Sequence, residues 1–179
     1  MAWLDTELDR LLAPGYLDGV DTRTLEEVRT MRAECQEAET AVSFLRRLAQ
    51  GRLDIVHACL DHAEGGSADL SSLVERLPAI IGAGHARPSG YGRLPSQMSP
   101  DLDSTDLTAE IDGVLDAEHI GTLPTMGEAD LRAVADRLTE IETRISDQRR
   151  ALHERIDRLQ AEIVSRYKTG EASVDGLLA

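Results

Sequence analysis

The chain has 179 residues, which is enough for one domain of ordinary size, and only five are aromatic (one Trp, three Tyr and one Phe). So few large rings argue against a thick globular core. The 33 acidic residues against 19 basic ones give a net charge of −14 at pH 7, which disfavours direct binding to DNA or to an anionic membrane.

The N-terminus, Met1-Ala-Trp-Leu-Asp, has neither the basic nor the apolar region of a signal peptide. No apolar run approaches the ~18 residues that span a bilayer. Both cysteines, Cys35 and Cys59, lie within helical patterns, so we expect small buried side chains in a reducing compartment. These features predict a cytoplasmic protein.

Residues 1–20 are expected to form a short amphipathic helix followed by a break at Pro14-Gly15. The apolar face of this helix consists of Leu4, Leu8, Leu11 and Leu12. Two roles are open for it, covering the end of the long-helix pair described next or contacting a partner.

Residues 24–64 are predicted to form a first long helix. Thr24-Leu-Glu-Glu27 is a capping box, and Gly65-Gly66 provides the stop. Apolar residues recur at spacings of three and four, the period of a helix. They are Leu25, Val28, Met31, Cys35, Ala38, Val42, Leu45, Ala49, Leu53, Val56 and Leu60.

Residues 65–124 are expected to link this helix to a second one. Ser67–Ile81 and Ser104–Leu115 each have the pattern of a short helix, and Gly82–Pro100 is rich in Gly, Pro and Ser, which predicts a flexible connection.

Residues 125–169 are predicted to form the second long helix, opened by another capping box, Thr125-Met-Gly-Glu128, and followed by a tail at 170–179. Its stripe consists of Leu131, Val134, Leu138, Ile141, Ile145, Gln148, Leu152, Ile156, Leu159 and Ile163.

A helix of about 40 residues is about 60 Å long, and its narrow apolar stripe needs a partner helix along that whole length. The connection is long enough for the second helix to fold back on the first. We therefore expect an all-α fold, a long antiparallel two-helix coiled-coil hairpin with a partly helical, partly flexible linker and a short N-terminal helix.

The two long helices carry the same polar pattern, at offsets 0, 4, 7, 11 and 15. The first copy is Glu39, Ser43, Arg46, Gln50 and Asp54, and the second is Glu142, Ser146, Arg149, His153 and Asp157. At roughly 100° per residue, these offsets fall within a sector of about 80°, so each copy forms one stripe.

Every member of both copies directly follows a position of the apolar stripe, so each polar stripe lies on the same flank of its own helix. Like flanks meet in an antiparallel pair. We therefore expect both stripes on one face, related by a pseudo-twofold axis. Glu39 would lie near Asp157 and Asp54 near Glu142, with the two motif arginines near the centre.

This face would offer two arginines, with Arg47 and Arg150 as neighbours, and four carboxylates. A carboxylate can accept the N1–H and N2–H of guanine, and a guanidinium can bond O6 and N7 or neutralise phosphate. A duplicated set suits a symmetric ligand with two guanines and two phosphates, such as cyclic di-GMP. The residues alone leave an anionic purine ligand and a partner protein both open.

The segment Arg29–Asp54, with its second copy at Glu142–Asp157, resembles RsiG, the actinobacterial anti-sigma factor of a sporulation sigma factor of the WhiG type. The family pattern is E-x3-S-x2-R-x3-Q-x3-D. The first copy here is complete, and the second has His153 in place of Gln.

The resemblance implies that all ten motif residues bind cyclic di-GMP, which holds the sigma factor inactive. We also predict that binding of the nucleotide and binding of the sigma factor reinforce each other, because each partner supplies part of the other's site. His153 would still donate to the ligand, and since histidine changes charge between pH 5 and 8, binding would become sensitive to pH.

Other functions have weaker support in the sequence. A structural coiled coil without a small ligand is the main alternative, and a helical enzyme lacks any recognisable base or metal arrangement. His57, Asp61 and His62 have the spacing of a metal site, but they lie at a helix end with no further ligand and are interpreted as surface residues. No Ser-His-Asp order, phosphate loop or CxxC pair is present, so we predict no enzyme.

Overall fold

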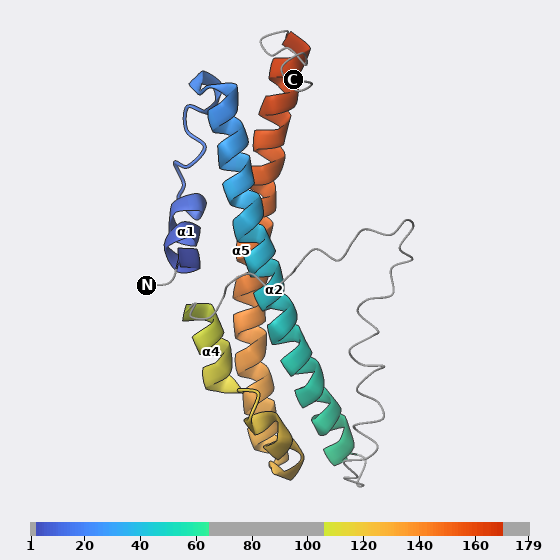
Figure 1. Ribbon diagram of the computed structural model, residues 1–179. Helices are drawn as coiled ribbons and strands as arrows, with labels where there is room; N and C mark the ends of the chain where they lie inside the picture. Colours follow the sequence, from blue (N-terminus) through green and yellow to red (C-terminus); the bar gives the residue numbers. More distant parts are fainter. Residues whose placement is uncertain (1–2, 65–105, 170–179) are drawn as a thin grey trace, which may run out of the picture. The chain divides into compact units, whose positions relative to one another are not determined.

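The computed structural model describes residues 3–64 and 106–169 (Figure 1). Helices form all the regular structure within these residues, which confirms the all-α fold. In chain order they are α1 (Trp3–Leu12), the 3₁₀ helix η1 (Val20–Thr22), α2 (Leu25–Glu64), α4 (Asp106–Val114), the 3₁₀ helix η2 (His119–Thr125) and α5 (Glu128–Thr169). The helix expected at 67–81, the flexible stretch at 82–100 and the tail at 170–179 lie outside the described residues.

The chain divides into two compact units, and each contains part of both long helices. Unit 1 consists of residues 1–43 and 146–179, and unit 2 consists of residues 44–145. Unit 1 therefore combines α1 and η1 with the N-terminal part of α2 and the C-terminal part of α5. Unit 2 combines the other parts of these two helices with α4 and η2.

The long helices run antiparallel within each unit. In unit 1, contacts at higher residue numbers on α2 are made to lower residue numbers on α5, from Arg29–Tyr167 through Arg32–Gln160 to Glu39–Arg149. In unit 2, Gln50 of α2 donates to Glu142 of α5, and the two ribbons run in opposite directions (Figure 1). The predicted antiparallel pairing is confirmed.

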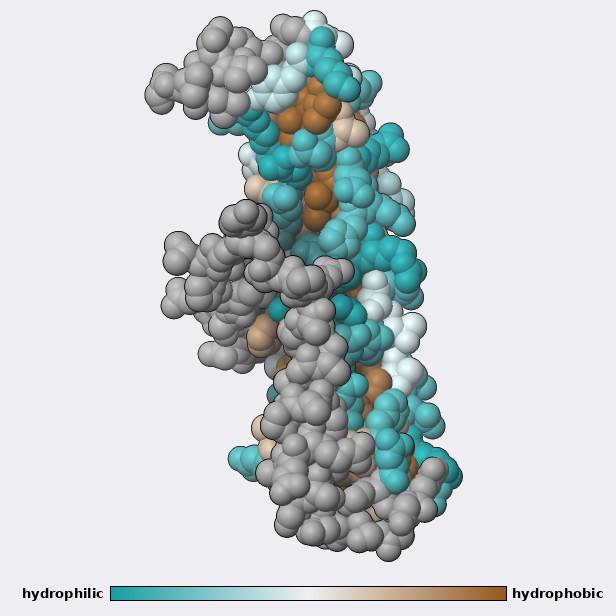
Figure 2. Space-filling view, turned by 90° about the vertical axis from the view of Figure 1, so that its right-hand side faces the viewer, coloured by the Kyte–Doolittle hydropathy of each residue, from teal (hydrophilic) through white to brown (hydrophobic). Residues whose placement is uncertain are grey.

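The predicted apolar stripes form the core of both units. The stripe residues that are fully buried are Val28, Cys35, Ala38, Val42, Leu45, Ala49 and Val56 on α2, and Leu131, Ile141, Ile145, Leu138, Leu152 and Leu159 on α5. Each buried Leu, Ile or Val contributes roughly 1.5–3 kcal/mol relative to an exposed one. On the outside of the molecule, hydrophilic residues cover most of the described surface in view, and hydrophobic residues form small patches between them (Figure 2).

Both cysteines are buried free thiols, as expected from their positions in the helical patterns. Burial raises the pKa of the Cys35 thiol and of the Cys59 thiol. Since the thiolate is the reactive form, burial keeps both groups inert.

In unit 1, α1 covers one flank of the long-helix pair. Its face of Leu4, Leu8 and Leu11 is buried. Arg10 pairs with Glu34 of α2 at 2.8 Å, and the backbone carbonyl of Leu12 accepts a hydrogen bond from Arg155 of α5 at 2.8 Å. The predicted N-terminal helix is therefore confirmed, and it packs against both long helices.

In unit 2, α4 covers one flank of the pair in a similar way. Leu107, Ile111 and Leu115 are buried. The acidic residues of α4 pair with arginines of the long helices, in the ion pairs Arg52–Asp112 and Arg144–Glu110. The helix expected within 104–115 is confirmed.

The capping box of α2 forms as predicted. The backbone N–H of Thr24 donates to the Glu27 carboxylate at 2.6 Å, and the N–H of Glu27 donates to the Thr24 hydroxyl at 3.2 Å. Hydrogen bonds to the carboxylate lower the pKa of Glu27.

The second predicted capping box is wrong, although α5 begins at Glu128 as expected. Thr125 ends the 3₁₀ helix η2, and its hydroxyl donates to the Thr122 carbonyl at 2.7 Å. The Glu128 carboxylate pairs instead with Arg132 one turn further on. Because Thr125 is the last residue of η2, its hydroxyl is directed to the Thr122 carbonyl and not to the first turn of α5.

The segment between α1 and α2 is held in shape by a buried arginine. Gly19 adopts φ +66°, a left-handed conformation that favours glycine, and starts η1. Arg166 of α5 is 8% exposed and donates to the backbone carbonyls of Val20, Asp21 and Arg23. Its Nε also donates to Glu162 at 2.7 Å, so this buried charge is paired.

Within the described ranges, none of the helices has an apolar stretch that would let it cross a membrane.

We expect R166A to destabilise the chain by about 2–4 kcal/mol, because it removes a buried charge-assisted network and leaves carbonyls without donors. Urea denaturation measures the loss, and amide hydrogen exchange should become faster around residues 20–23. R158A, which removes an exposed arginine of the same helix, is the matched control. Equal stabilities of the two variants would contradict this role of Arg166.

Candidate functional site

The register of the apolar stripes puts the duplicated motif residues at the edge of the core. Ala38 and Val42, which precede the first two motif residues of α2, are fully buried, and so are Ile141 and Ile145 on α5. Each following residue lies about 100° further round the helix. The side chains of both motifs therefore begin beside the core and extend towards solvent.

In unit 1, residues from both motifs form one hydrogen-bonded group, the Glu39 cluster, which consists of Glu39, Ser43, Arg149 and His153. The Glu39 Oε1 atom accepts hydrogen bonds from the Ser43 hydroxyl at 2.6 Å and from Arg149 Nε at 2.9 Å. His153 Nε2 lies 3.2 Å from the same oxygen. Arg149 Nε also donates to the Ser43 hydroxyl at 2.8 Å.

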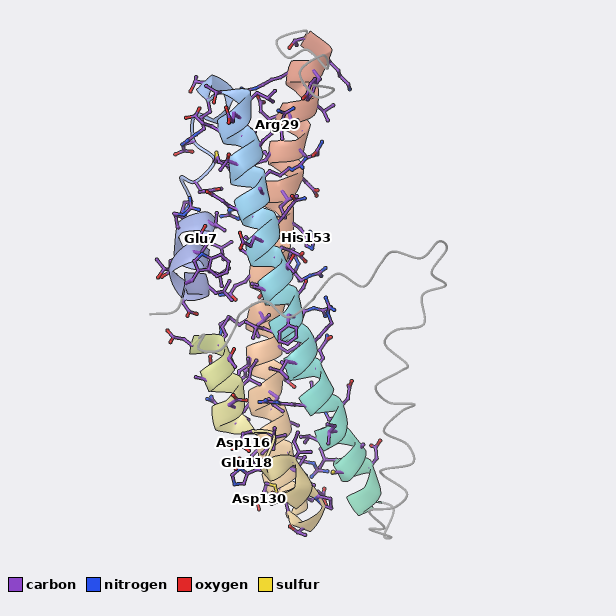
Figure 3. The ribbon with its side chains drawn as sticks, in the orientation of Figure 1. Glu7, Arg29, Asp116, Glu118, Asp130 and His153 are labelled. Carbon is purple, nitrogen blue, oxygen red and sulfur yellow. The ribbon has the colours of Figure 1, made fainter. Side chains whose placement is uncertain are left out.

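The cluster lies on the flank of unit 1 that α1 leaves open. Figure 3 shows Glu7 of α1 on one side of the long-helix pair and His153 on the other. Glu39 is mostly buried, with 19% of its side chain exposed, whereas 36% of Arg149 and 45% of His153 are exposed. The carboxylate therefore forms the base of the cluster, and the cationic and imidazole groups reach solvent.

Burial by itself raises the pKa of Glu39. Hydrogen bonds from Ser43 and Arg149, together with the nearby His153, outweigh burial and hold this pKa below the ordinary glutamate value. A carboxylate with a lowered pKa stabilises the fold above its ordinary pKa, and this contribution is lost as the pH falls through the lowered value. The cluster therefore favours the charged form of Glu39 at neutral pH.

In unit 2, the corresponding group is the Glu142 cluster, which consists of Glu142, Arg46 and Gln50. Gln50 Nε2 donates to Glu142 Oε1 at 2.9 Å, and Arg46 Nη1 lies 3.6 Å from the same oxygen. Of these side chains, 20% of Glu142 and 28% of Arg46 are exposed. The ion pair is longer than a hydrogen bond, so Arg46 is held less tightly than Arg149.

The two clusters have the same plan. In each, the glutamate that starts one motif pairs with the third and fourth residues of the other motif, on the opposite helix. His153 Nε2 occupies the place that Gln50 Nε2 has in unit 2, beside the glutamate. The replacement of Gln by His therefore keeps a nitrogen at this position.

The pairing differs by one to two helical turns from the pairing expected from the sequence. Glu39 contacts Arg149 and His153, where Asp157 was expected, and Glu142 contacts Arg46 and Gln50, where Asp54 was expected. Opposed carboxylates repel each other, and the observed register replaces this repulsion with attraction.

The aspartates that end the two motifs lie outside these contacts. Asp54 and Asp157 are exposed, and neither forms a hydrogen bond or ion pair with a described residue. Ser146 is half-buried on α5. Each aspartate follows its cluster along the same helix face and is accessible to a ligand.

Several polar atoms of the clusters are without protein partners. The contacts of Arg149 use its Nε atom, and those of Glu39 use its Oε1 atom. The two Nη groups of Arg149 and the Oε2 atom of Glu39 therefore have no hydrogen-bond partner within the described part of the chain. Arg46 Nε is buried without a hydrogen-bond acceptor. The clusters therefore present hydrogen-bond donors and acceptors beyond those that they use between the helices.

The metal interpretation of His57 and Asp61 gains no support, because no group of three or more metal-ligating side chains occurs among the described residues. The side chain of His62 lies outside the described residues.

A family model described as RsiG-like matches residues 14–81 and 118–179, which include both long helices and all ten motif residues. No curated protein matches the sequence. Helices α1 and α4 lie outside the matched segments.

S43A should raise the pKa of Glu39 towards the ordinary glutamate value, because the Ser43 hydroxyl donates to its carboxylate. It should also cost about 1 kcal/mol of stability at pH 7, and this loss should shrink as the pH falls through the pKa of Glu39. Carboxyl NMR titration and urea denaturation measure the two effects. The control is S165A, at an exposed serine of α5; a Glu39 titration identical in both variants would contradict the prediction.

Proposed function

The chain belongs to the RsiG-like family of anti-sigma factors, and from this premise we propose that it binds cyclic di-GMP through its two motifs. With the nucleotide bound, it sequesters a sporulation sigma factor of the WhiG type. Family membership supports a regulator rather than an enzyme. The observation that carries the nucleotide proposal is the duplicated cluster in which a glutamate and an arginine from opposite helices meet beside the core.

The chemistry of each cluster suits a guanine nucleotide. A glutamate carboxylate accepts the N1–H and N2–H of guanine, a pair of donors that adenine does not present. The arginine beside it has free Nη donors in unit 1, which suit guanine O6 and N7 or a phosphate oxygen. The exposed Asp54 and Asp157 provide further acceptors along the same faces.

The charge of the chain suits the proposed protein partner. Sigma factors expose basic surfaces that contact DNA, and a chain with a net charge of −14 complements such a surface. The same charge repels an anionic nucleotide except near the arginines. The nucleotide therefore binds only where the motifs place a cation.

A structural coiled coil without a small ligand is the alternative. The contacts between Glu39 and Arg149 and between Glu142 and Arg46 would also help to hold two helices in register. This alternative assigns no role to the exposed aspartates at the end of each motif. It predicts that the chain binds no nucleotide.

We expect R46A and R149A each to lose about 1–3 kcal/mol of cyclic di-GMP binding. R46A should change the melting temperature little, because the ion pair of Arg46 with Glu142 is long, at 3.6 Å, whereas R149A should cost at least as much stability as S43A, because it removes hydrogen bonds to Glu39 and Ser43. Calorimetric titration with cyclic di-GMP, cyclic di-AMP and GMP measures affinity and selectivity. The control is R137A, at an exposed arginine of α5 outside the motifs. If the unaltered chain binds none of the three nucleotides, the structural alternative is correct.

Cyclic di-GMP and the sigma factor should each raise the affinity for the other, because binding is reciprocal when each partner completes the other's site. The affinity of the chain for the sigma factor, measured with and without cyclic di-GMP, tests this coupling. Equal sigma affinity under both conditions would refute it.

His153 should make nucleotide binding depend on pH, because a histidine changes charge between pH 5 and 8 and this one lies 3.2 Å from the glutamate of its cluster. We expect the affinity for cyclic di-GMP to differ between pH 5.5 and pH 8 in the unaltered chain. H153Q, which restores the family pattern, should reduce that difference. An unaltered chain with the same affinity at both pH values would show that the charge of His153 has no part in binding.

A further inference from the structure

The duplicated pattern extends by one residue type beyond the five positions of the motif. Each motif arginine is directly followed by a second arginine, Arg47 on α2 and Arg150 on α5. Both lie eight residues after the glutamate that starts their motif. The repeat therefore contains a second cation at the same offset in both copies.

Helix geometry places these arginines on the outer edge of the motif face. Arg47 is three residues before Gln50 and seven before Asp54, and residues at these separations share one helix face. Arg150 has the same spacing to His153 and Asp157. Motif arginines 46 and 149 begin closer to the core, next to buried stripe positions.

Both side chains are available to a ligand. Arg47 is exposed, and no described residue forms a hydrogen bond or ion pair with it. Arg150 is 70% exposed, and its Nη1 atom lies 2.9 Å from Oδ1 of Asp147, three residues earlier on the same helix. An exposed pair of this kind contributes little stability, so a phosphate can replace its carboxylate at small cost.

Charge balance shows why a second cation is needed. In unit 2, Glu142 and Asp54 carry two negative charges against one positive charge on Arg46, which leaves one negative charge. In unit 1, the two negative charges of Glu39 and Asp157 and the one positive charge of Arg149 leave the same net charge. The motif arginines also contact glutamates, and one further arginine in each unit brings the charge of these groups to zero.

We propose that Arg47 and Arg150 bind the phosphates of the nucleotide, while the motif carboxylates and arginines recognise its bases. This inference rests on the proposed function. Each side chain supplies a guanidinium on the outer edge of the motif face in its own unit. A phosphodiester next to that edge accepts charge-assisted hydrogen bonds from it.

The test is calorimetric titration of the full-length chain with cyclic di-GMP at several salt concentrations, for R47Q and R150Q. Each variant should bind roughly tenfold more weakly, as expected for the loss of one charge-assisted hydrogen bond. The slope of log affinity against log salt should become smaller by about one, because one phosphate contact is lost. R47K and R150K should recover part of the affinity, since lysine keeps the charge.

Two control variants match the exposure and pairing of the test residues. R137Q removes an exposed arginine of α5 that pairs with a carboxylate three residues away, as Arg150 does. R158Q removes an exposed arginine that, like Arg47, has no ion pair among the described residues. Both change the net charge by the same amount as the test variants and should keep affinity within about twofold, because helix geometry places both about 100° or more round α5 from its motif residues.

The outcomes separate this inference from the proposed function. If the unaltered chain binds cyclic di-GMP and the variants at 47 and 150 behave like those at 137 and 158, the phosphate role is wrong and the proposed function stands. If the unaltered chain does not bind, the proposed function itself is wrong. Weaker binding with a smaller salt slope, confined to the variants at 47 and 150, supports the inference.

Discussion

Two helices of about 40 residues each can bury only a narrow stripe of their surface, and burying it requires a lengthwise partner. This constraint sets the register of α2 against α5 within each unit. Because every motif residue directly follows a stripe position, the same constraint determines on which flank the polar groups lie. A change of register along the stripe would therefore move the polar contacts as well as the core.

The clusters stabilise the helix pair and still contain polar atoms that have no hydrogen-bond partner among the described residues. Glu39 is desolvated, but its hydrogen bonds and the nearby cation more than offset the burial and keep it charged. The contacts concentrate on one carboxylate oxygen and one arginine nitrogen. A site can be held in place between two helices in this way and still present donors and acceptors to a ligand, which lowers the entropy lost when the ligand binds.

The long helices and the polar flank could be predicted from the sequence, because both follow from spacings of three and four. Their antiparallel direction could be predicted from the long connection between them. The contacts within the clusters could not be predicted from spacing alone, because a shift of one to two turns exchanges a carboxylate neighbour for His153 or Gln50 and an arginine. The second capping box was wrong because Thr125 ends η2 and its hydroxyl is directed to the carbonyl of Thr122. The roles of Arg155 and Arg166 were missed because their acceptors are mainly backbone carbonyls, which have no signature in the residue types.

The way Arg166 holds the segment before α2 has a consequence for sequence variation. It bonds to main-chain oxygens, which every amino acid provides. Replacing the exposed side chains of Asp21 or Arg23 therefore leaves the anchor in place. Inserting or deleting a residue there would displace the peptide groups themselves. This segment therefore tolerates amino-acid substitutions much better than insertions or deletions.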